Sequence, residues 1–275
     1  MHAVLKYPGA KWSLAEWIIS HFPPHHSYLE PFFGSGAVLF NKPRSNIETV
    51  NDLDGDVVNL FEWIRKDPER LAEEIYWIPY ARDVFDKAWD QRYAEMNSFQ
   101  RAVNFYIRMM MGYGFRVSGA KVGWKKDVQG REAAYAANMW CKAPEKIRAS
   151  AERLRGVQIE NKPAVELIRA FNFPNVLIYC DPPYVLSARS GEKRQYKHEM
   201  TDADHSELLD VLKAHRGPVL ISGYPSELYD RELRGWYRET TTATDQLSRR
   251  RQEVLWMNFE PERQQETLFT EEVEP

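Results

Sequence analysis

The stretch Val176-Leu177-Ile178-Tyr179-Cys180-Asp181-Pro182-Pro183-Tyr184 joins a short apolar run to a carboxylate, two prolines and an aromatic ring. An apolar run of this length, ended by prolines, is typical of a central strand in a parallel sheet. Proline has no amide hydrogen to donate to a neighbouring strand, so the strand must end before Pro182. Asp181 is therefore predicted at the carboxyl edge of the sheet, where open α/β folds bind their ligands.

The residues that follow this strand suit a planar substrate that carries an amino group. Each proline holds the residue before it in an extended conformation, which makes the Asp-Pro-Pro-Tyr tetrapeptide stiff. The Asp181 carboxylate and the Pro182 carbonyl oxygen would accept the two amino hydrogens, while the Tyr184 ring would stack on the substrate. The alternative is a strand-end turn with a solvated aspartate, and the tetrapeptide alone leaves both open.

The length, charge and cysteine content of the chain narrow its class. With 275 residues it can form one large α/β domain or a domain with a sizeable insertion. Its formal net charge of −3 gives no global basic field, so a nucleic-acid-binding face must be local. Cys141 and Cys180 lack metal-ligand spacing, and no apolar run has membrane-spanning length. We expect a soluble, cytoplasmic protein without a metal site, a disulfide framework or a membrane segment.

A second motif follows an early strand. Ser27–Glu30 is predicted to be a short strand that leads into Pro31-Phe32-Phe33-Gly34-Ser35-Gly36 and then into a helix. Strand, glycine-rich turn and helix form the first unit of nucleotide-binding α/β folds, where glycine lets a ligand approach the backbone. The Phe-x-Gly-x-Gly spacing differs from the pattern that cradles a pyrophosphate, so it favours a ligand without phosphates.

Acidic residues follow the next predicted strand, Ile47–Asn51. An acid at this position can hold a ribose diol through charge-assisted hydrogen bonds. Asp52 is the better-placed candidate, and Asp54 could instead cap the helix that follows. Nearer the amino terminus, a Pro-Gly turn opens a helix and Lys11 lies beside it. Such a turn suits an anion or a carboxylate, although most Pro-Gly turns are only turns.

Residues 68–155 show helical periodicity and few strand patterns. Within them, the loop 112–126 interleaves glycines, aromatic residues and cations. This composition can approach a nucleic-acid backbone, and a solvated loop is the alternative. The loop 185–197 is also basic and could order on a phosphate backbone. The candidate DNA-contacting cations of the two loops are Arg116, Lys121, Lys125, Lys126, Arg189 and Arg194.

Together these motifs make almost the whole chain resemble the Dam-like family of N6-adenine DNA methyltransferases. Tyr7-Pro8-Gly9-Ala10-Lys11 is similar to the amino-terminal motif of that family. Glu30-Pro31-Phe32-Phe33-Gly34-Ser35-Gly36 is similar to its cofactor loop, Asn51-Asp52 to its ribose-binding acid, and Asp181-Pro182-Pro183-Tyr184 to its catalytic motif. Each motif is modest alone, but four in the right order and spacing are highly specific.

The resemblance implies an α/β fold, with a Rossmann-like S-adenosylmethionine-dependent methyltransferase sheet and a mainly helical target-recognition insertion. Residues 1–67 and 156–260 would form the catalytic domain, and residues 68–155 the target-recognition domain. Residues 261–275 would be an acidic, disordered tail.

The resemblance also implies which residues bind S-adenosylmethionine. Tyr7 and Lys11 would lie near its methionine end, Asp52 on its ribose, and the loop residues Phe32, Gly34 and Gly36 beneath it. The family commonly carries an acid that meets the adenine amine of the cofactor, whereas Glu160 and Asn161 stand at that place in this chain. Asn161 would accept this hydrogen bond through its amide oxygen, more weakly than a carboxylate.

The implied reaction is methyl transfer to the N6 amine of an adenine flipped out of double-stranded DNA, by a monomer that needs no metal ion. Asp181 would serve both the cofactor and the base, the Pro182 carbonyl would accept an amino hydrogen, and Tyr184 would stack on the flipped base. Two other enzyme activities stay open: N4-cytosine methylation of DNA and methylation of RNA. A catalytically silent DNA-binding module is the alternative from a different class.

Overall fold

The computed structural model describes residues 3–89, 95–113, 117, 119–128, 135–189, 195–244 and 250–261. The predictions made for Arg116, Arg194 and the tail from residue 262 onward lie outside the described residues. Among the residues described, no helix is long and apolar enough to cross a membrane.

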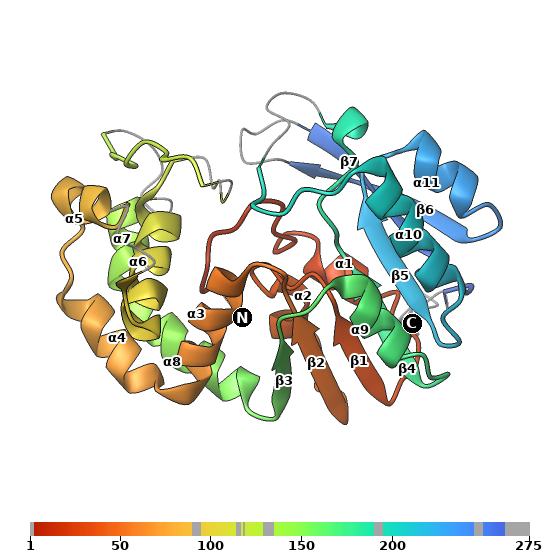
Figure 1. The fold of residues 1–275 in the computed structure, drawn as a ribbon, viewed down its shortest axis with the longest axis horizontal. Helices are drawn as coiled ribbons and strands as arrows, with labels where there is room; N and C mark the ends of the chain where they lie inside the picture. Colours follow the sequence, from red (N-terminus) through yellow and green to blue (C-terminus); the bar gives the residue numbers. More distant parts are fainter. Residues whose placement is uncertain are drawn as a thin grey trace, which may run out of the picture.

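A seven-stranded sheet in the order β3-β2-β1-β4-β5-β7-β6 forms the centre of the described chain (Figure 1). The first five strands of this order are parallel, and β7 is antiparallel to both β5 and β6. This arrangement, with helices packed against the sheet, confirms the predicted α/β, Rossmann-like class. The strands are β1 (Ser27–Glu30), β2 (Ile47–Asn51), β3 (Val157–Glu160), β4 (Val176–Cys180), β5 (Val219–Gly223), β6 (Tyr237–Thr244) and β7 (Arg250–Met257).

Strand β4 lies in the middle of the sheet, and all five of its residues are buried. It pairs with β1 on one side, where Val176 is opposite Ser27, and with β5 on the other. Strand β1 in turn pairs with β2, where Ser27 is opposite Ile47. Because these strands are parallel and in step, the segments after β1, β2 and β4 meet at one edge of the sheet, and Asp181 lies at that edge as predicted.

Alternate residues of β4 face two different hydrophobic clusters, as the two-residue period of a strand requires. Leu177 and Tyr179 belong to the cluster shared with α1 and α2, while Val176 and Ile178 belong to the cluster shared with α9, α10 and α11. The sheet is therefore covered by helices on both faces (Figure 1). These helices are α1 (Ala15–Ile19), α2 (Ala37–Asn41), α9 (Ala164–Ala170), α10 (Asp202–Lys213) and α11 (Glu227–Glu232), and a short 3-10 turn, η3, spans Leu186–Ala188.

A helical segment follows β2 and lies beyond the β3 edge of the sheet (Figure 1). Helix α6 begins with a capping box, in which Asn97 and Gln100 each bond the backbone amide of the other. All three methionines at its end are buried, so its apolar face is core. The helices of this region are α3 (Gly55–Lys66), α4 (Pro68–Trp77), α5 (Arg82–Lys87), α6 (Ser98–Met111), α7 (Ala136–Cys141) and α8 (Ala143–Leu154).

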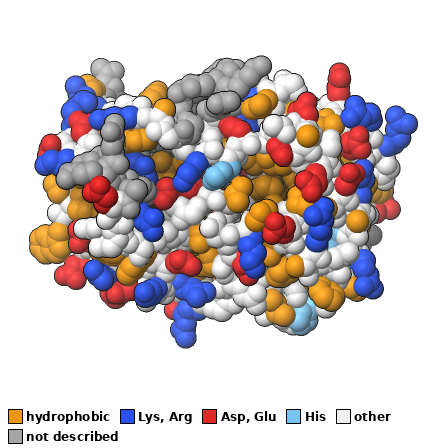
Figure 2. Space-filling model, in the orientation of Figure 1, with side chains coloured by type: hydrophobic (Ala, Val, Ile, Leu, Met, Phe, Trp, Pro, Cys, Tyr) orange, Lys and Arg blue, Asp and Glu red, His pale blue; other side chains and the backbone are white. Residues whose placement is uncertain are grey.

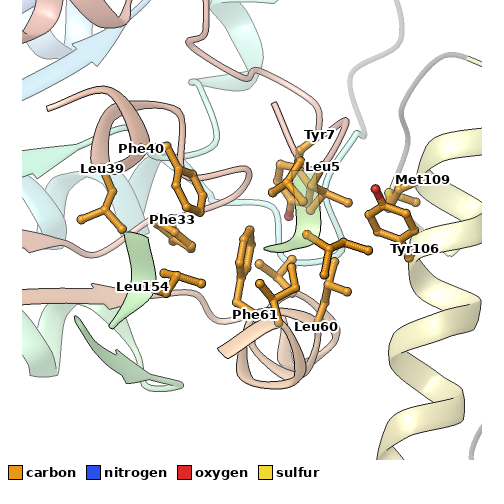
Figure 3. Packing of buried hydrophobic residues seen from close by; sticks show 14 of the residues in the cluster. Leu5, Tyr7, Phe33, Leu39, Phe40, Leu60, Phe61, Tyr106, Met109 and Leu154 are labelled. Carbon is orange, nitrogen blue, oxygen red and sulfur yellow. The ribbon is translucent and has the colours of Figure 1, made fainter. Parts of the chain in front are cut away.

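The helical segment and the sheet share one hydrophobic cluster. Figure 3 shows Phe61 of α3 between Phe33, which follows β1, and Tyr106 of α6. Phe33 and Phe61 pack edge to face with ring centroids 4.7 Å apart. The two parts are therefore joined by continuous packing, while their separate roles in catalysis and target recognition stay a prediction.

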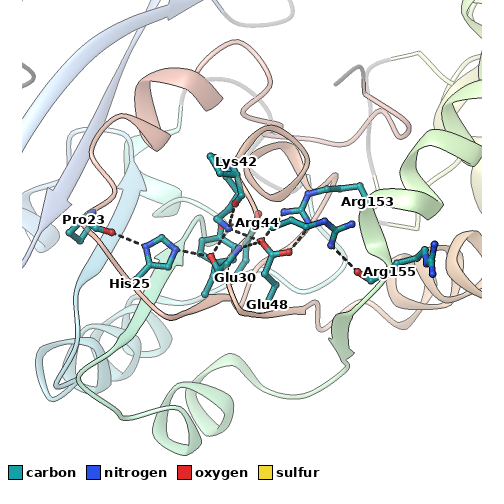
Figure 4. Close-up of polar contacts among 11 residues, drawn as sticks. Pro23, His25, Glu30, Lys42, Arg44, Glu48, Arg153 and Arg155 are labelled. Carbon is teal, nitrogen blue, oxygen red and sulfur yellow. Dashed lines mark hydrogen bonds and ion pairs between the residues drawn. The ribbon is translucent and has the colours of Figure 1, made fainter.

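A buried ionic cluster also ties α8 to the sheet (Figure 4). The Glu48 carboxylate on β2 accepts hydrogen bonds from Arg153 Nη1 at 2.6 Å, Arg153 Nη2 at 2.8 Å and Lys42 Nζ at 2.7 Å. Arg44, which follows α2, donates to the Glu152 and Arg155 carbonyl oxygens, both at 2.8 Å. These contacts fix the last helix of the helical segment against the second strand.

Candidate active site at the carboxyl edge of the sheet

A cavity of about 630 Å³ opens at the carboxyl ends of β1, β2 and β4. Its wall combines the amino-terminal turn, the glycine loop after β1, the acidic loop after β2, the start of α9 and residues 196–200. Six of the residues predicted to bind a cofactor line it, namely Tyr7, Lys11, Phe32, Gly34, Asp52 and Asp181. The sheet register thus brings together motifs that are far apart in the sequence.

Both carboxylate oxygens of Asp181 have partners. Lys11 Nζ lies 3.0 Å from Oδ2, and Ser222 at the end of β5 donates its hydroxyl to Oδ1 at 2.8 Å. Lys11 is only 5% exposed, and it also donates to the Gly9 carbonyl oxygen at 2.7 Å. Burial alone would lower the pKa of Lys11, but Asp181 and Glu253 outweigh it and raise that pKa. Lys11 is therefore a fixed cation that orients the Asp181 carboxylate.

The aromatic residue of the motif is also held in place. The Tyr184 hydroxyl donates to Glu253 Oε2 at 2.7 Å, and the Tyr224 ring meets Tyr184 edge to face with centroids 4.6 Å apart. Lys11 Nζ lies over the Tyr184 ring, 4.7 Å from its centroid. Of the tetrapeptide, Asp181 and Pro183 line the cavity, whereas Pro182 is buried and Tyr184 is partly exposed beside it.

The glycine loop requires glycine at two positions. Gly34 and Gly36 have φ angles of +49° and +70°, a region that side chains disfavour. A Cβ atom would also lie 3.0 Å from the Tyr7 ring at residue 34 and 2.5 Å from the Phe33 ring at residue 36. Gly34 thus lets the backbone approach Tyr7 at the cavity wall, and Gly36 lets the loop turn into α2.

The two acids after β2 have separate roles. Asp52 accepts hydrogen bonds from the Gly34 amide at 2.8 Å and the Asp54 amide at 2.9 Å. These bonds hold its carboxylate in place in the cavity wall. Burial raises the pKa of Asp52 to about 6. Asp54 caps α3 by accepting from the Asp56 amide at 3.0 Å, as the sequence left open.

Several cavity residues were not singled out as site residues from the sequence, among them Glu30, Tyr196 and Lys197. Glu30, at the end of β1, is buried and accepts a hydrogen bond from the Tyr28 hydroxyl at 2.8 Å, and burial raises its pKa to about 8. Strand alternation would place Tyr28 and Glu30 on one face, which is the only sequence signal for this pair. Tyr196 packs against Gly9, and Lys197 Nζ lies 3.0 Å from Asp54. They extend the wall over the cavity from the far end of the basic loop.

Asn161 does not line this cavity. Its side chain is exposed, and its Nδ2 donates to the Asp52 carbonyl oxygen at 2.7 Å. Pro163, Ala164 and Val165 stand at the nearby wall instead. In this structure Asn161 therefore fixes the backbone after β2 and is not part of the cavity wall where the cofactor contact was predicted.

The predicted DNA-contacting cations fall into two groups. Lys121 and Lys126 are exposed, with Lys121 Nζ 2.7 Å from Asp86, and Lys125 is partly buried, 3.9 Å from Asp127. Arg189 is different, because its side chain is almost fully buried and bonds Glu199 at 2.8 Å. Its guanidinium also lies 5.3 Å from the Tyr196 ring centroid, so the structure gives Arg189 an internal role. On the face in Figure 2, Lys and Arg alternate with Asp and Glu, in keeping with the small net charge.

The sheet order, the helices on both faces and the cavity at the carboxyl edge define a Rossmann-like α/β fold, which is consistent with a methyltransferase. A family model described as "D12 class N6 adenine-specific DNA methyltransferase" matches residues 7–251, so the chain belongs to that family. Within the part of the chain that the structure describes, no group of three or more His, Cys, Asp or Glu side chains could hold a metal ion.

Curated relatives have the corresponding name. The chain is 25% identical over 253 residues to the DNA adenine methylase of Escherichia coli (strain K12), covering 86% of this chain and 84% of that protein. It is 25% identical over 259 residues to the DNA adenine methylase of Salmonella typhi, with the same coverage. It is 24% identical over 258 residues to the DNA adenine methylase of Vibrio cholerae serotype O1 (strain O395), with 90% of each chain covered.

Proposed function

We propose that this protein transfers a methyl group from S-adenosylmethionine to the N6 amine of an adenine flipped out of double-stranded DNA. The observation that carries the proposal is the Asp181 carboxylate, held between Lys11 and Ser222 at the cavity built by the glycine loop and Asp52. The family to which the chain belongs and the names of its relatives support the adenine specificity. A cytoplasmic monomer is the state we expect for the enzyme.

The residues that line the cavity fit S-adenosylmethionine. The volume of about 630 Å³ lies within the range of about 300 to 1,000 Å³ that is usual for small-molecule sites. Asp52 would accept from the ribose hydroxyls, while Lys11 and Tyr7 would hold the methionine end. The Asp181 carboxylate lies in the same cavity, which suits a ligand that carries positive charge. When bound, the cofactor supplies a methyl group on a sulfonium, which makes that methyl a ready electrophile.

The chain contributes the geometry of the amine. The nitrogen of an adenine amine is a poor nucleophile because its lone pair is delocalised into the ring. If the Asp181 carboxylate and the Pro182 carbonyl accept hydrogen bonds from its two N–H groups, the nitrogen moves toward a tetrahedral arrangement. Its lone pair then points along one direction. Positioning and electrostatics then provide most of the rate enhancement. Asp181 is also placed to take the proton that the amine loses.

Access to the amine requires the base to leave the helix. Within a duplex the N6 amine is paired, and extrusion of the base costs roughly a few kcal/mol. Tyr184 would stack on the extruded base, which offsets part of this cost. Contacts with the DNA backbone would offset more, and the loop cations Lys121, Lys125 and Lys126 are our candidates, together with Arg116 and Arg194 outside the described residues.

The direct test is transfer of labelled methyl from S-adenosylmethionine to unmethylated duplex DNA, with nucleoside analysis of the product. N6-methyladenine is the expected product. N4-methylcytosine would overturn the base assignment, and preferential labelling of RNA in a competition assay would overturn the substrate class. Absence of transfer despite cofactor binding would indicate a silent binding module.

Cofactor affinity should fall as the pH is lowered through about 6, the raised pKa of Asp52. Above this pH, Asp52 is ionised and makes charge-assisted hydrogen bonds to the ribose, and below it the neutral acid makes weaker ones. The loss should be roughly tenfold by isothermal titration calorimetry at fixed ionic strength. Asp52→Asn is the matched control, since it cannot ionise but keeps the titration of Glu30 near pH 8. A wild-type curve as flat as that of the variant between pH 5 and 7 would contradict this role.

A further inference from the structure

The side chain that bonds Tyr184 comes from the antiparallel end of the sheet. Glu253 lies on β7, 69 residues after Tyr184, and is only 7% exposed. The strand register places its neighbour Val254 opposite Gly223, the last residue of β5, and Tyr224 follows directly. The β5 and β7 strands thus bring a carboxylate and a ring to the same tyrosine, the carboxylate at its hydroxyl and the ring in a T-shaped contact.

We propose that Glu253 is a positioning residue, which fixes the ring plane of Tyr184 so that the flipped base can stack on it. The inference rests on the proposed function, because it assigns Glu253 a part in presenting the base to Asp181. Glu253 itself touches neither the base nor the cofactor in this proposal, and acts through the Tyr184 hydroxyl.

Three contacts define the orientation of the Tyr184 ring. A tyrosine side chain rotates about two torsion angles. The 2.7 Å hydrogen bond to Glu253 restrains the hydroxyl at its far end. The Tyr224 ring, inclined by 68°, limits rotation of Tyr184 about its own axis. Lys11 lies over one face of the ring. Because Lys11 takes this face, we assign the opposite face to the base.

The charges around Glu253 agree with a structural reason for its presence. Burial raises the pKa of Glu253, while Lys11 and the Tyr184 hydroxyl act in the opposite direction and Asp181 adds repulsion. A buried carboxyl group so close to a second acid is costly unless it has partners. Lys11 interacts electrostatically with both Asp181 and Glu253. The orientation of Tyr184 and that of Asp181 therefore depend on one cation.

The test is a double-mutant cycle on methyl transfer, with Glu253→Ala, Tyr184→Phe and the double variant. Glu253→Ala should lower kcat/KM for DNA by roughly ten- to a hundredfold, the effect of a misplaced binding group, without changing cofactor affinity. Because both single changes remove the same hydrogen bond, the double variant should be no slower than the slower single variant. Fluorescence of 2-aminopurine at the target base should report weaker stacking in all three.

Two further variants control the cycle. Glu253→Gln keeps an acceptor oxygen for the Tyr184 hydroxyl, so its kcat/KM should stay within about threefold of wild type. Glu239→Ala removes a glutamate from the adjacent strand β6, where its carboxylate bonds His21 at 2.8 Å, and should leave the rate unchanged. If Glu253→Ala does not fold, Glu253→Gln and Tyr184→Phe decide the matter, and a folded Glu253→Gln as slow as Tyr184→Phe would overturn the inference.

The failures of the two proposals are distinguishable. A wild-type protein that transfers no methyl group would overturn the proposed function, and this inference with it. An active wild type with an equally active Glu253→Ala, or losses that multiply in the double variant, would overturn the role of Glu253 alone. A change in cofactor affinity in Glu253→Ala would assign Glu253 to the support of Lys11 and would likewise overturn it.

Discussion

Asp181→Ala should lower kcat for methyl transfer by about 10³-fold or more while the chain keeps its fold. The change removes the carboxylate that would accept a hydrogen bond from the adenine amine. This amine nitrogen is where positive charge develops in the transition state. The fold should persist because the buried strand β4 ends before this residue and keeps all its ladder contacts. The rate should be measured in single turnover at saturating cofactor, so that a change in binding is not mistaken for a change in chemistry.

The same change has a predictable cost in stability, which the experiment must separate from catalysis. Lys11 would keep its bond to the Gly9 carbonyl oxygen but lose its buried partner, and an unpaired buried cation destabilises by about 3 to 5 kcal/mol. Thermal unfolding and far-ultraviolet circular dichroism therefore accompany the rate measurement. Asp210→Ala is the matched control, because Asp210 is an exposed aspartate paired to Lys213. A folded Asp181→Ala within tenfold of the wild-type rate would refute the mechanism.

The sequence predicts the parts of the site that depend on local chemistry. Two prolines end β4 wherever it lies, which puts Asp181 at the sheet edge. The acid two residues after Asp52 caps α3, while Asp52 lines the cavity, where Asp54 lies beside it. Gly34 and Gly36 are needed for backbone angles that follow from the turn itself. Each of these features requires only a few neighbouring residues.

The contacts that the sequence did not predict join side chains far apart in the chain. Glu253 and Tyr184 are 69 residues apart, and Glu48 and Arg153 are 105 apart. Such pairs depend on strand register and helix packing, which residue spacing does not reveal. The sequence also does not reveal the orientation of side chains in loops. Asn161 follows the expected strand, but its amide bonds the Asp52 carbonyl oxygen. Arg189 lies in a basic loop, but its guanidinium forms an ion pair with Glu199.

Glu48→Ala should reduce the free energy of unfolding by about 3 to 5 kcal/mol, because it leaves Arg153 and Lys42 without their shared carboxylate. Glu48 is 3% exposed and Arg153 is 9% exposed, so water cannot replace the lost partner freely. A loss of this size is a large part of the roughly 5 to 15 kcal/mol that stabilises a typical protein. Since Arg153 is on α8 and Glu48 on β2, the helical segment should also become less firmly fixed to the sheet. Urea denaturation of the two proteins measures the difference.

Glu69→Ala is the matched control for this prediction, since it removes a glutamate that bonds another arginine of the same helix. The Glu69 and Arg148 side chains are 71% and 45% exposed, so their 2.8 Å ion pair should contribute only about 0 to 1 kcal/mol.

The pH dependence of the stability gives a second check. Burial would raise the pKa of Glu48, but hydrogen bonds from Arg153 and Lys42 outweigh it and lower that pKa below its usual 4.5. The stabilisation is therefore present above pH 4.5 and is lost as the pH falls through the lowered value, so the gap between wild type and Glu48→Ala should narrow in acid. Equal losses in Glu48→Ala and Glu69→Ala at neutral pH would show that burial does not set the strength of this cluster.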